Sequence, residues 1–419
     1  MIERYYLKEM KDIWCEKNYY RKWVQIEAAV LKVRGMESLA ARLLKIDVEP
    51  QQVRDREKIS GHELNAFLSI LQERVKDSTG EIHKGLTSSD IMDTARILQI
   101  KDSIKQIQSK MAGILEILKN IAVKNRDLIM CGRTHGQIAE PITLGLKFSR
   151  YLDAGRRSSD RLKKCQKNLL VGQISGAVGT YSLVTPVEEE LILKELKLKP
   201  ASITSQVLPR DIFAEYVFIL ALISSFAEEI SQEIRLLSQD LIKEVSEPFT
   251  SKQTGSSAMP HKKNPVICER ICGLARLVKS HVGVALSNIA LWNERDISHS
   301  SNERIILEEA SSLTYYLLDR LFFVLENINI HKENIKDNVE KAGVMLFSSG
   351  VLKSLLDAGI SRKEAYKLTQ DMFRNNFSRT RIKNVLIKKI GLSDRKAEEV
   401  LSSQYFLNNI KNIFERIKL

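Results

Sequence analysis

The placement of proline is the feature that most constrains the fold of this chain. Only eight prolines occur in 419 residues; none lies between Gln51 and Glu140, and none follows Pro265. An internal proline removes a backbone hydrogen bond and costs a helix about 3 kcal/mol. The long stretches without proline therefore permit helices well beyond the average length of about eleven or twelve residues.

Apolar residues recur in these stretches at the three- and four-residue spacing of one helix face. One such stripe consists of Ile104, Ile107, Met111, Ile114, Leu118 and Ile121. A second, between Pro209 and Pro248, consists of Ile219, Ile223, Phe226, Ile230, Leu237 and Leu241. Two more long periodic segments begin after Pro265 and near Glu303. The pattern predicts an all-α fold built on a long-helix bundle, whose broad apolar stripes sister chains would cover.

We expect three helical domains: residues 1–95 at the N-terminus, residues 96–342 as the central long-helix bundle, and residues 343–419 as a small C-terminal domain. The breaks between helices are rich in glycine and polar residues, as in "HKGLTSSD" (83–90), "CGRTHGQIAEP" (131–141) and "VGQISGAVGTYS" (171–182). Because "SGAVGT" lacks the lysine of a phosphate-binding P-loop, we interpret it as a bend where two backbones approach closely.

The net charge of +13 does not by itself indicate a nucleic-acid partner. Lysine and arginine are spread along the chain and mixed with acidic residues, without a basic arm or zinc-finger spacing. An anionic small-molecule site explains the excess better. No run of about eighteen uncharged apolar residues occurs, and the N-terminal "MIERYYLKEMKD" lacks the apolar core of a signal peptide. We therefore expect no nucleic acid, no membrane and a cytoplasmic location.

The five cysteines are scattered and odd in number, which favours reduced thiols over a disulfide framework. Cys268 and Cys272 lie four residues apart with His261 nearby, but no fourth ligand stands at a spacing suited to zinc. We expect these cysteines to be ordinary buried thiols, with no metal and no cofactor.

Several of the seven histidines fall in the polar breaks between helices. A single histidine in a helical protein is usually an ordinary surface or core residue. Several of them, flanked by glycine, serine, threonine and arginine in separate loops, indicate a shared pocket, because such loops gather at the ends of a bundle. The histidines in question are His62, His83, His135, His261 and His299.

The segment "GSSAMPHKKNP" (255–265) is the densest cluster of small, polar and cationic groups. Ser256 and Ser257 supply hydroxyls, Lys262 and Asn264 can donate to an oxyanion, and the helix expected after Pro265 directs its positive end to the same region. A serine acts as a base only where its alkoxide is strongly stabilised, and such donors provide that. The alternative is a helix-capping loop, with serine caps and proline at the helix start.

The same segment closely resembles the signature loop of the fumarase/aspartase superfamily, "GSSxMPxKxNP". The resemblance implies a homotetramer whose long helices form a twenty-helix core, with each active site drawn from three chains. It also implies the anti elimination of fumarate across a carbon–carbon bond.

Within the superfamily, the whole chain resembles the adenylosuccinate lyases, through "MIERYY", "HKGLTSSD", "GRTHGQIAEP", "ITSQVLPRD", "LWNERDISHSSNERIIL" and "DAGISRKEAY". The implied substrates are nucleotides of purine biosynthesis. They are adenylosuccinate, which gives AMP, and SAICAR, the succinylated aminoimidazole-carboxamide ribotide, which gives AICAR.

The resemblance also assigns catalytic roles. Ser256 corresponds to the base that takes a proton from the carbon next to a carboxylate, and His135 to the acid that protonates the departing nitrogen. Glu269 corresponds to the carboxylate that keeps His135 charged and oriented. Lys262 corresponds to a donor that holds the carboxylates and the dianionic intermediate.

Substrate-binding positions follow from the same resemblance. They are Arg4, Tyr5, His62, Glu63, His83, Thr87, Ser88, Gln206, Ser257, Asn264, Arg270, Arg295, Ser300 and Arg304. Arginine and hydroxyl donors suit a nucleotide phosphate. Glu63 departs from the family, which often has aspartate there, and the extra methylene can shift His62. For Arg295 and Arg304, the alternative is a surface salt bridge with Glu294 or Glu303.

Two other classes of function stay open. One is a sister lyase of the superfamily, acting on argininosuccinate, aspartate or malate. The other is a helical scaffold without catalytic activity, against which the intact set of Ser256, His135, Lys262 and Glu269 argues.

Overall fold

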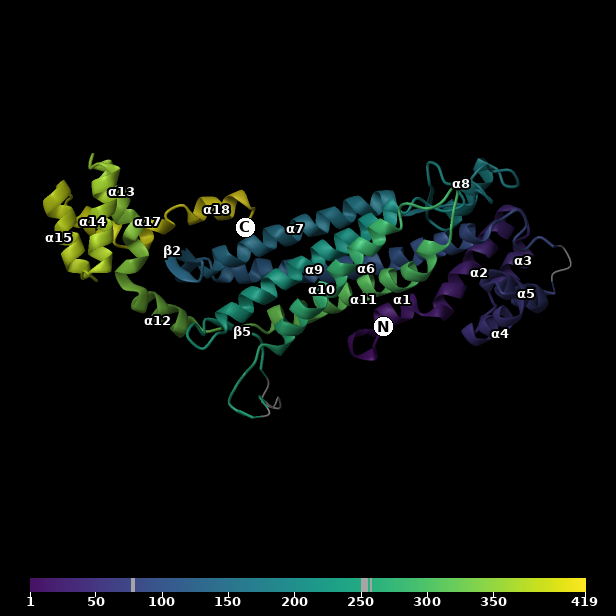
Figure 1. Cartoon of the computed structure of the whole chain (residues 1–419), viewed down its shortest axis with the longest axis horizontal. Helices are drawn as coiled ribbons and strands as arrows, with labels where there is room; N and C mark the ends of the chain where they lie inside the picture. Colours follow the sequence, from purple (N-terminus) through teal and green to yellow (C-terminus); the bar gives the residue numbers. More distant parts are fainter. Residues whose placement is uncertain (77–79, 250–254, 257) are drawn as a thin grey trace. The chain divides into compact units, whose positions relative to one another are not determined.

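A computed structural model of the chain describes residues 1–76, 80–249, 255–256 and 258–419 (Figure 1). The described chain is mostly helical, so the expected all-α class is confirmed. None of the described helices combines the length and the apolar character needed to cross a membrane. The chain forms two compact units, which we describe one at a time. The division into three domains at residues 95 and 342 stays a prediction.

Four long helices correspond to the segments that the proline pattern and the apolar periodicity predict. They are α6 (Ser88–Lys124), α9 (Asp211–Leu237), α10 (Val266–Ser287) and α11 (Ser298–Glu326). A further long helix, α7 (Leu144–Leu169), was not predicted. The stripe residues Ile104 and Ile223 are completely buried. The second stripe ends earlier than expected, because α9 stops at Leu237 and leaves Leu241 95% exposed in the turn that follows.

The first unit comprises residues 1–112, 157–228 and 270–321. Besides parts of the long helices it holds these elements: η1 (Glu3–Tyr5), α1 (Lys8–Trp14), α2 (Glu16–Val33), α3 (Glu37–Leu43), α4 (Pro50–Ser60), α5 (Glu63–Val75), β3 (Val171–Gly172), α8 (Pro186–Glu195) and β4 (Lys199–Pro200). Strands β3 and β4 pair in parallel. Aromatic rings from α2 and α5 pack edge to face, with Trp23 against Tyr20 and Phe67.

Buried polar contacts join the long helices within this unit. Helices α9 and α11 lie side by side (Figure 1), where the hydroxyls of Tyr216 and Ser311 are 2.9 Å apart and those of Ser224 and Thr314 are 3.1 Å apart. Each buried hydroxyl needs a partner, since leaving it unpaired costs about 1–3 kcal/mol. These pairs therefore fix how the two helices pack along their shared face.

The bend predicted at "SGAVGT" is confirmed. Gly179 has φ +76°, and a Cβ there would lie 2.3 Å from the carbonyl oxygen of Thr204. Only glycine tolerates both the backbone angle and the close approach. The bend thereby brings the backbone next to residues 204–205.

The second unit comprises residues 113–156, 229–269 and 322–419. It holds these elements: β1 (Ile129–Thr134), β2 (Gln137–Thr143), β5 (Val245–Ser246), β6 (Asn329–Ile330), α12 (Lys332–Ala342), η2 (Gly343–Phe347), α13 (Ser348–Asp357), α14 (Arg362–Arg374), α15 (Arg379–Ile390), α16 (Asp394–Val400), α17 (Ser403–Leu407) and α18 (Ile410–Arg416). Helices α13 to α17 cluster (Figure 1) around a core that includes Phe347, Leu355 and Leu386.

The segment "CGRTHGQIAEP" forms an antiparallel hairpin of β1 and β2, where the sequence indicated only a glycine-rich break. Thr134 pairs with Gln137, so the turn has two residues, His135 and Gly136, with φ +54° and +73°. Two positive φ angles are typical of the type I′ turn, which suits the twist of a hairpin. The register shifts between Cys131 and Arg133, as in a β-bulge.

We predict that Gly145→Ala destabilises the protein by about 1–3 kcal/mol, because an added Cβ at the start of α7 meets fixed backbone. That Cβ would lie 2.4 Å from the carbonyl oxygen of Ala122 and 2.7 Å from Cα of Arg126. Urea unfolding gives the free energy of unfolding. Ser149→Ala, one turn along the same helix, removes an atom and serves as the control, with an expected loss of about 1 kcal/mol or less. Equal losses for the two variants would contradict the prediction.

Candidate active site

The predicted site residues are divided between the two units. The first unit holds Arg4, Tyr5, His62, Glu63, His83, Thr87, Ser88, Gln206, Arg270, Arg295, Ser300 and Arg304, and the second holds His135, Ser256, Lys262, Asn264 and Glu269. Ser257 lies outside the described residues.

In the first unit, four guanidinium groups surround a small cavity that we call the arginine pocket. Its volume is about 20 Å³, which is room for one water molecule. The lining residues are Tyr19, Ser89, Met92, Asp93, Arg96, Arg210, Arg295, His299, Ser300, Glu303 and Arg304. Three predicted substrate-binding residues, Arg295, Ser300 and Arg304, are thus brought together here.

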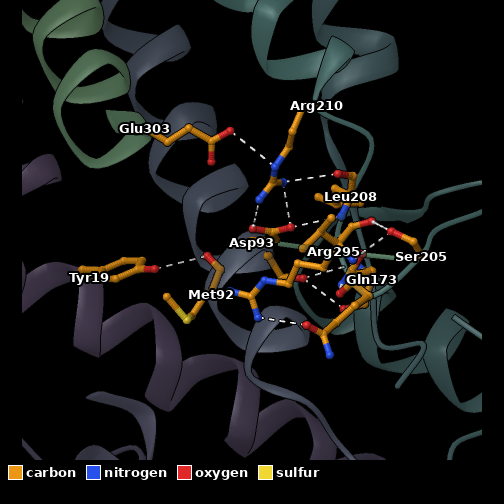
Figure 2. Close-up of polar contacts among 12 residues, drawn as sticks. Tyr19, Met92, Asp93, Gln173, Ser205, Leu208, Arg210, Arg295 and Glu303 are labelled. Atoms are coloured by element: carbon orange, nitrogen blue, oxygen red, sulfur yellow. Dashed lines mark hydrogen bonds and ion pairs between the residues drawn. The ribbon is translucent and has the colours of Figure 1, made fainter. Parts of the chain in front are cut away.

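The centre of the arginine pocket is a buried, bidentate ion pair (Figure 2). Arg210 donates from Nη1 and Nη2 to the two carboxylate oxygens of Asp93, at 2.8 and 2.9 Å, and the Leu208 N–H donates to the same carboxylate at 3.0 Å. On its other side, Arg210 Nε lies 3.3 Å from Glu303. The Arg210 side chain is only 1% exposed. Arg210 therefore supports the pocket from the interior of the unit, and its side chain is not accessible to a ligand.

Among the arginines of the pocket, Arg304 is exposed and Arg295 is half-buried. Arg295 donates from Nη1 to the side-chain oxygen of Gln206 at 2.9 Å, which joins two residues that the sequence assigned to the site. Arg304 pairs with Glu63 and keeps 43% of its side chain exposed. The alternative partners, Glu294 and Glu303, are thus replaced by Gln206 and Glu63. Tyr20 also donates to Glu63 at 2.9 Å, so α2, α5 and α11 meet at this carboxylate.

Charge in the arginine pocket is not balanced. Burial raises the pKa of Glu303 to about 7, against the opposing effect of Arg210, so this carboxyl is only partly ionised at neutral pH. Burial, together with repulsion from Arg210, lowers the pKa of His299 to about 4 and leaves the ring neutral. Burial also lowers the pKa of Arg295. Four arginines thus outnumber the carboxyl groups that contact them, which are Asp93, Glu63 and the partly protonated Glu303, and an excess of positive charge favours an anion.

Two histidines of the first unit have local partners instead of a shared pocket. His83, with φ +62°, is held by buried Glu27, which accepts from its backbone N–H at 3.0 Å and contacts Nδ1 at 2.8 Å. His62 is exposed and caps α5, where Nδ1 accepts the N–H of Asn65 at 3.4 Å. Neither histidine lines the arginine pocket.

Thr87 and Ser88 lie at the start of α6. The Thr87 N–H donates to Asp90 at 2.9 Å, and Asp90 also accepts the N–H of Ser175 at 3.0 Å. Burial raises the pKa of Asp90 to about 6, although these hydrogen bonds oppose the change. The contacts fix the backbone from which both hydroxyls project.

The N-terminal pair contacts α11. The ring of Tyr5 packs edge to face on Tyr316 at 5.4 Å, and Arg270 donates to the Tyr316 hydroxyl at 3.2 Å. Arg4 is exposed on η1. Tyr5 and Arg270, two predicted binding residues, therefore share one neighbour.

In the second unit, backbone donors point at the oxygen of Ser256. Its Oγ accepts the N–H groups of Ala258 and Met259, both at 3.3 Å. Gly255 allows the tight path of the loop, because a Cβ there would lie 2.5 Å from the carbonyl oxygen of Pro260. Hydrogen bonds to an oxygen stabilise its charged form, so this geometry favours the alkoxide.

The other predicted catalytic groups of this unit are exposed. His135 stands at the tip of the β1–β2 turn, Lys262 lies in the loop, and Glu269 lies in the first turn of α10. Across the described residues of one chain, no hydrogen bond or ion pair joins His135 to Ser256 or Glu269. The residues that the structure describes also contain no group of three or more His, Cys, Asp or Glu side chains able to hold a metal ion.

The positive end of α10 already has a partner. Buried Glu247 accepts the N–H groups of Ile267 at 3.1 Å and of Cys268 at 2.9 Å. Those two donors, which the sequence suggested for a substrate anion, are therefore satisfied within the chain.

Sequence reasoning did not select the residues that support these groups. Asp93 and Arg210 form the central ion pair of the arginine pocket. Asp93 lies just after "HKGLTSSD" and Arg210 lies within "ITSQVLPRD", but neither residue was assigned a role from the sequence. They are 117 residues apart, and no local pattern pairs them. The one sequence feature that could have indicated a structural role for Arg210 is its position directly after Pro209, at the start of an apolar helix.

Known proteins resemble this chain over its full length. A family model described as "Lyase" matches residues 9–279. Curated proteins named adenylosuccinate lyase are similar: one from Aquifex aeolicus is 39% identical over 100% of this chain and 99% of its own length, and one from Bacillus subtilis is 36% identical over 100% of both.

Solved structures support the fold. A fumarate lyase from a Mesorhizobium species has a TM-score of 0.87 at 24% identity, covering 100% of this chain and 99% of that one. A 3-carboxy-cis,cis-muconate lactonizing enzyme from Pseudomonas putida has a TM-score of 0.87 at 23% identity, covering 99% and 96%.

We predict that Glu303 makes the folded state less stable as pH rises. Its pKa is about 7 when folded and near the ordinary 4.5 when unfolded, so the folded state keeps a proton that the unfolded state has released. The stabilisation is complete below about pH 4.5 and is lost as pH rises through 7, by on the order of 1–3 kcal/mol. Urea unfolding of wild type and Glu303→Gln at pH 5 and pH 8 measures it.

The variant cannot titrate at position 303, so it should lack this component of the pH dependence. Glu340→Gln, at an exposed position of α12, should keep the wild-type dependence. The assignment is wrong if Glu303→Gln and wild type lose equal stability between the two pH values.

Proposed function

This chain belongs to the adenylosuccinate lyase family and is a carbon–nitrogen lyase, and we propose that it removes fumarate from adenylosuccinate and from SAICAR by serine-base, histidine-acid catalysis. The full-length similarity supports the reaction class. The two products, AMP and AICAR, belong to purine biosynthesis, and we assign the enzyme to the cytoplasm. The proposed roles need no metal and no cofactor.

The observation that carries this proposal is the arginine pocket. Its excess of positive charge, with Arg295 and Arg304 beside the hydroxyl of Ser300, suits a dianionic phosphate. The cavity itself has room for only one water molecule, so the phosphate would bind at its open side, where Arg304 is exposed. Arg4 and Tyr5 would contact the same phosphate. The substrates of fumarase and aspartase carry no phosphate, so enzymes acting on them need no phosphate-binding site.

Ser256 is the proposed base. Its Oγ takes a proton from the carbon next to a succinyl carboxylate, and the electron pair moves onto that carboxylate to give a dianion. The amides of Ala258 and Met259 lower the cost of the alkoxide that this step requires. Lys262 and Asn264 hold the carboxylate oxygens on which the charge develops, and Thr87, Ser88 and Ser257 add hydroxyl donors.

His135 is the proposed acid. The dianion collapses, the carbon–nitrogen bond breaks, and the imidazolium of His135 gives its proton to the departing nitrogen as fumarate leaves. Glu269 keeps the imidazolium charged and correctly turned. Gln206 and Arg270 contact the substrate, and His62, Glu63 and His83 shape the pocket around its phosphate or ribose.

The active site is proposed to form only in a homotetramer, from three chains. The long helices carry exposed apolar side chains that water does not favour and a sister chain would cover. They include Phe218 and Leu236 on α9, Leu277, Val284 and Leu286 on α10, and Ile305 on α11. Groups from the two units of different chains would then face one another.

We predict turnover of both adenylosuccinate and SAICAR by the purified protein, followed by ultraviolet absorbance. Argininosuccinate, aspartate and malate should not react, because they lack the phosphate. Ser256→Ala should reduce kcat by about a thousandfold or more with a similar KM, since only the transition state needs the base. Ser402→Ala, in the C-terminal helices, is the control. Turnover of argininosuccinate without adenylosuccinate, or full activity of Ser256→Ala, would refute the assignment.

We predict that Arg295→Gln raises KM for adenylosuccinate by about ten- to a hundredfold, which corresponds to the loss of about 1–3 kcal/mol of a charged hydrogen bond. The dephosphorylated substrate, succinyladenosine, should be affected little, because it makes no phosphate contact. Steady-state kinetics on both compounds gives the comparison, with the exposed Arg374→Gln as control. A role in phosphate binding is excluded if both substrates are weakened equally.

A further inference from the structure

Two buried carboxylates of the second unit have no part in the proposed reaction. Glu244 and Glu247 stand three residues apart, at either end of β5, and their exposed fractions are 0% and 5%. Burying a carboxylate is costly unless hydrogen bonds or a cation compensate. Both have such partners, and the partners lie on the two segments that carry His135 and Ser256.

Glu244 holds the hairpin of His135. Arg133 on β1 donates to it from Nη1 and Nη2, at 2.8 and 2.7 Å, in a bidentate pair. Asn338 of α12 donates to the same carboxylate at 2.9 Å and to the Ile242 carbonyl at 2.8 Å. Bidentate pairs fix geometry as well as charge. The carboxylate thus ties β1 to α12.

Arg133 is well placed to orient the turn. It stands two residues before His135 and next to the β-bulge, where a ladder is locally disrupted and free to bend. Gly132 is needed at the bulge, because a Cβ there would lie 2.5 Å from the carbonyl oxygen of Glu140. Arg133 is therefore anchored just before the two-residue turn that holds His135.

Glu247 holds the segment that carries Ser256. It directly precedes Pro248, and its carboxylate accepts the N–H groups of Ile267 and Cys268 in the first turn of α10. The carboxylate therefore joins residue 247 to residues 267–268 and closes the base of the stretch between them. A negative charge at a helix N-terminus is also favoured by the helix dipole.

The two carboxylates share one rigid support. Strand β5 pairs antiparallel with β6, with Val245 opposite Ile330 and Ser246 opposite Asn329. The His331 N–H donates to the Glu244 carbonyl at 3.0 Å, and Asn329 donates to the Glu247 carbonyl at 3.2 Å. We call residues 244–247 the brace.

We infer that the brace positions both proposed catalytic segments, with Glu244 orienting the His135 hairpin through Arg133 and Glu247 closing the base of the Ser256 segment. This inference rests on the proposed function, because that function assigns catalytic roles to His135 and Ser256. Glu244 and Glu247 are positioning residues, since neither touches the reacting atoms. A displacement of about 1 Å in a catalytic group is enough to reduce a rate about a hundredfold.

The test uses the full-length protein with Glu244→Gln and Glu247→Gln, and with Glu398→Gln as the control. Glu398 of α16 accepts from Arg379 of α15 at 2.9 Å in the same unit. We expect each brace variant to lower kcat about ten- to a hundredfold with KM within about threefold of wild type. The control should keep both constants within about twofold.

Hydrogen exchange without substrate gives a second readout, which does not depend on activity. Exchange should speed up in residues 129–143 for Glu244→Gln and in residues 266–269 for Glu247→Gln. Should Glu244→Gln fail to fold, the double variant Arg133→Met with Glu244→Met removes both charges together and leaves neither unpaired. It should show the same loss of kcat.

The outcomes separate the two proposals. Slower kcat together with faster exchange in the named segment supports the brace. Unchanged exchange, an unchanged kcat, or a loss confined to KM overturns it. If wild type does not turn over adenylosuccinate or SAICAR, the proposed function fails, while the exchange data still report whether Glu244 and Glu247 hold these segments.

Discussion

The buried ion pair between Asp93 and Arg210 is the interaction on which the first unit depends. It joins α6 to the residue directly before α9, and through Glu303 it reaches α11. Removing two charges from water is favourable only with good geometry and further hydrogen bonds, which the bidentate pair and the Leu208 amide provide. Because three long helices converge on it, their ends cannot shift independently, and the surrounding arginines keep their places.

That arrangement leaves positive charge without full compensation. Asp93 is committed to Arg210, Arg304 pairs with Glu63, and burial keeps Glu303 partly protonated, while Arg295 donates to the neutral amide of Gln206. Such a site is less stable without its ligand than a balanced one, and a bound phosphate would supply the missing charge. The same excess of positive charge is the basis of the proposal that a nucleotide phosphate binds here.

The second unit applies a different principle to its reactive groups. Ser256 lies half-buried on a loop and His135 lies exposed on a tight turn, while Glu244 and Glu247 are buried. Exposure of His135 is compatible with the proposed site, in which it would meet groups from other chains. Burial of Glu244 and Glu247 confines the charge to fixed hydrogen bonds, which limits how far the segments can move. The serine gains two backbone donors from its own loop, so its activation is local even if the complete site is not.

The sequence alone determined the helices and the chemistry of the loops. Helix formation depends on contacts three and four residues apart, so the proline gaps and apolar spacing located α6, α9, α10 and α11, and "GSSAMPHKKNP" identified the family. The hairpin of His135 was missed because strand pairing within "CGRTHGQIAEP" depends on a turn with two positive φ angles. Only the tertiary structure decided which buried charges meet, as with Asp93 and Arg210 or Arg133 and Glu244. Such partners are about a hundred residues apart, and no local pattern specifies a contact that forms only when distant segments pack together.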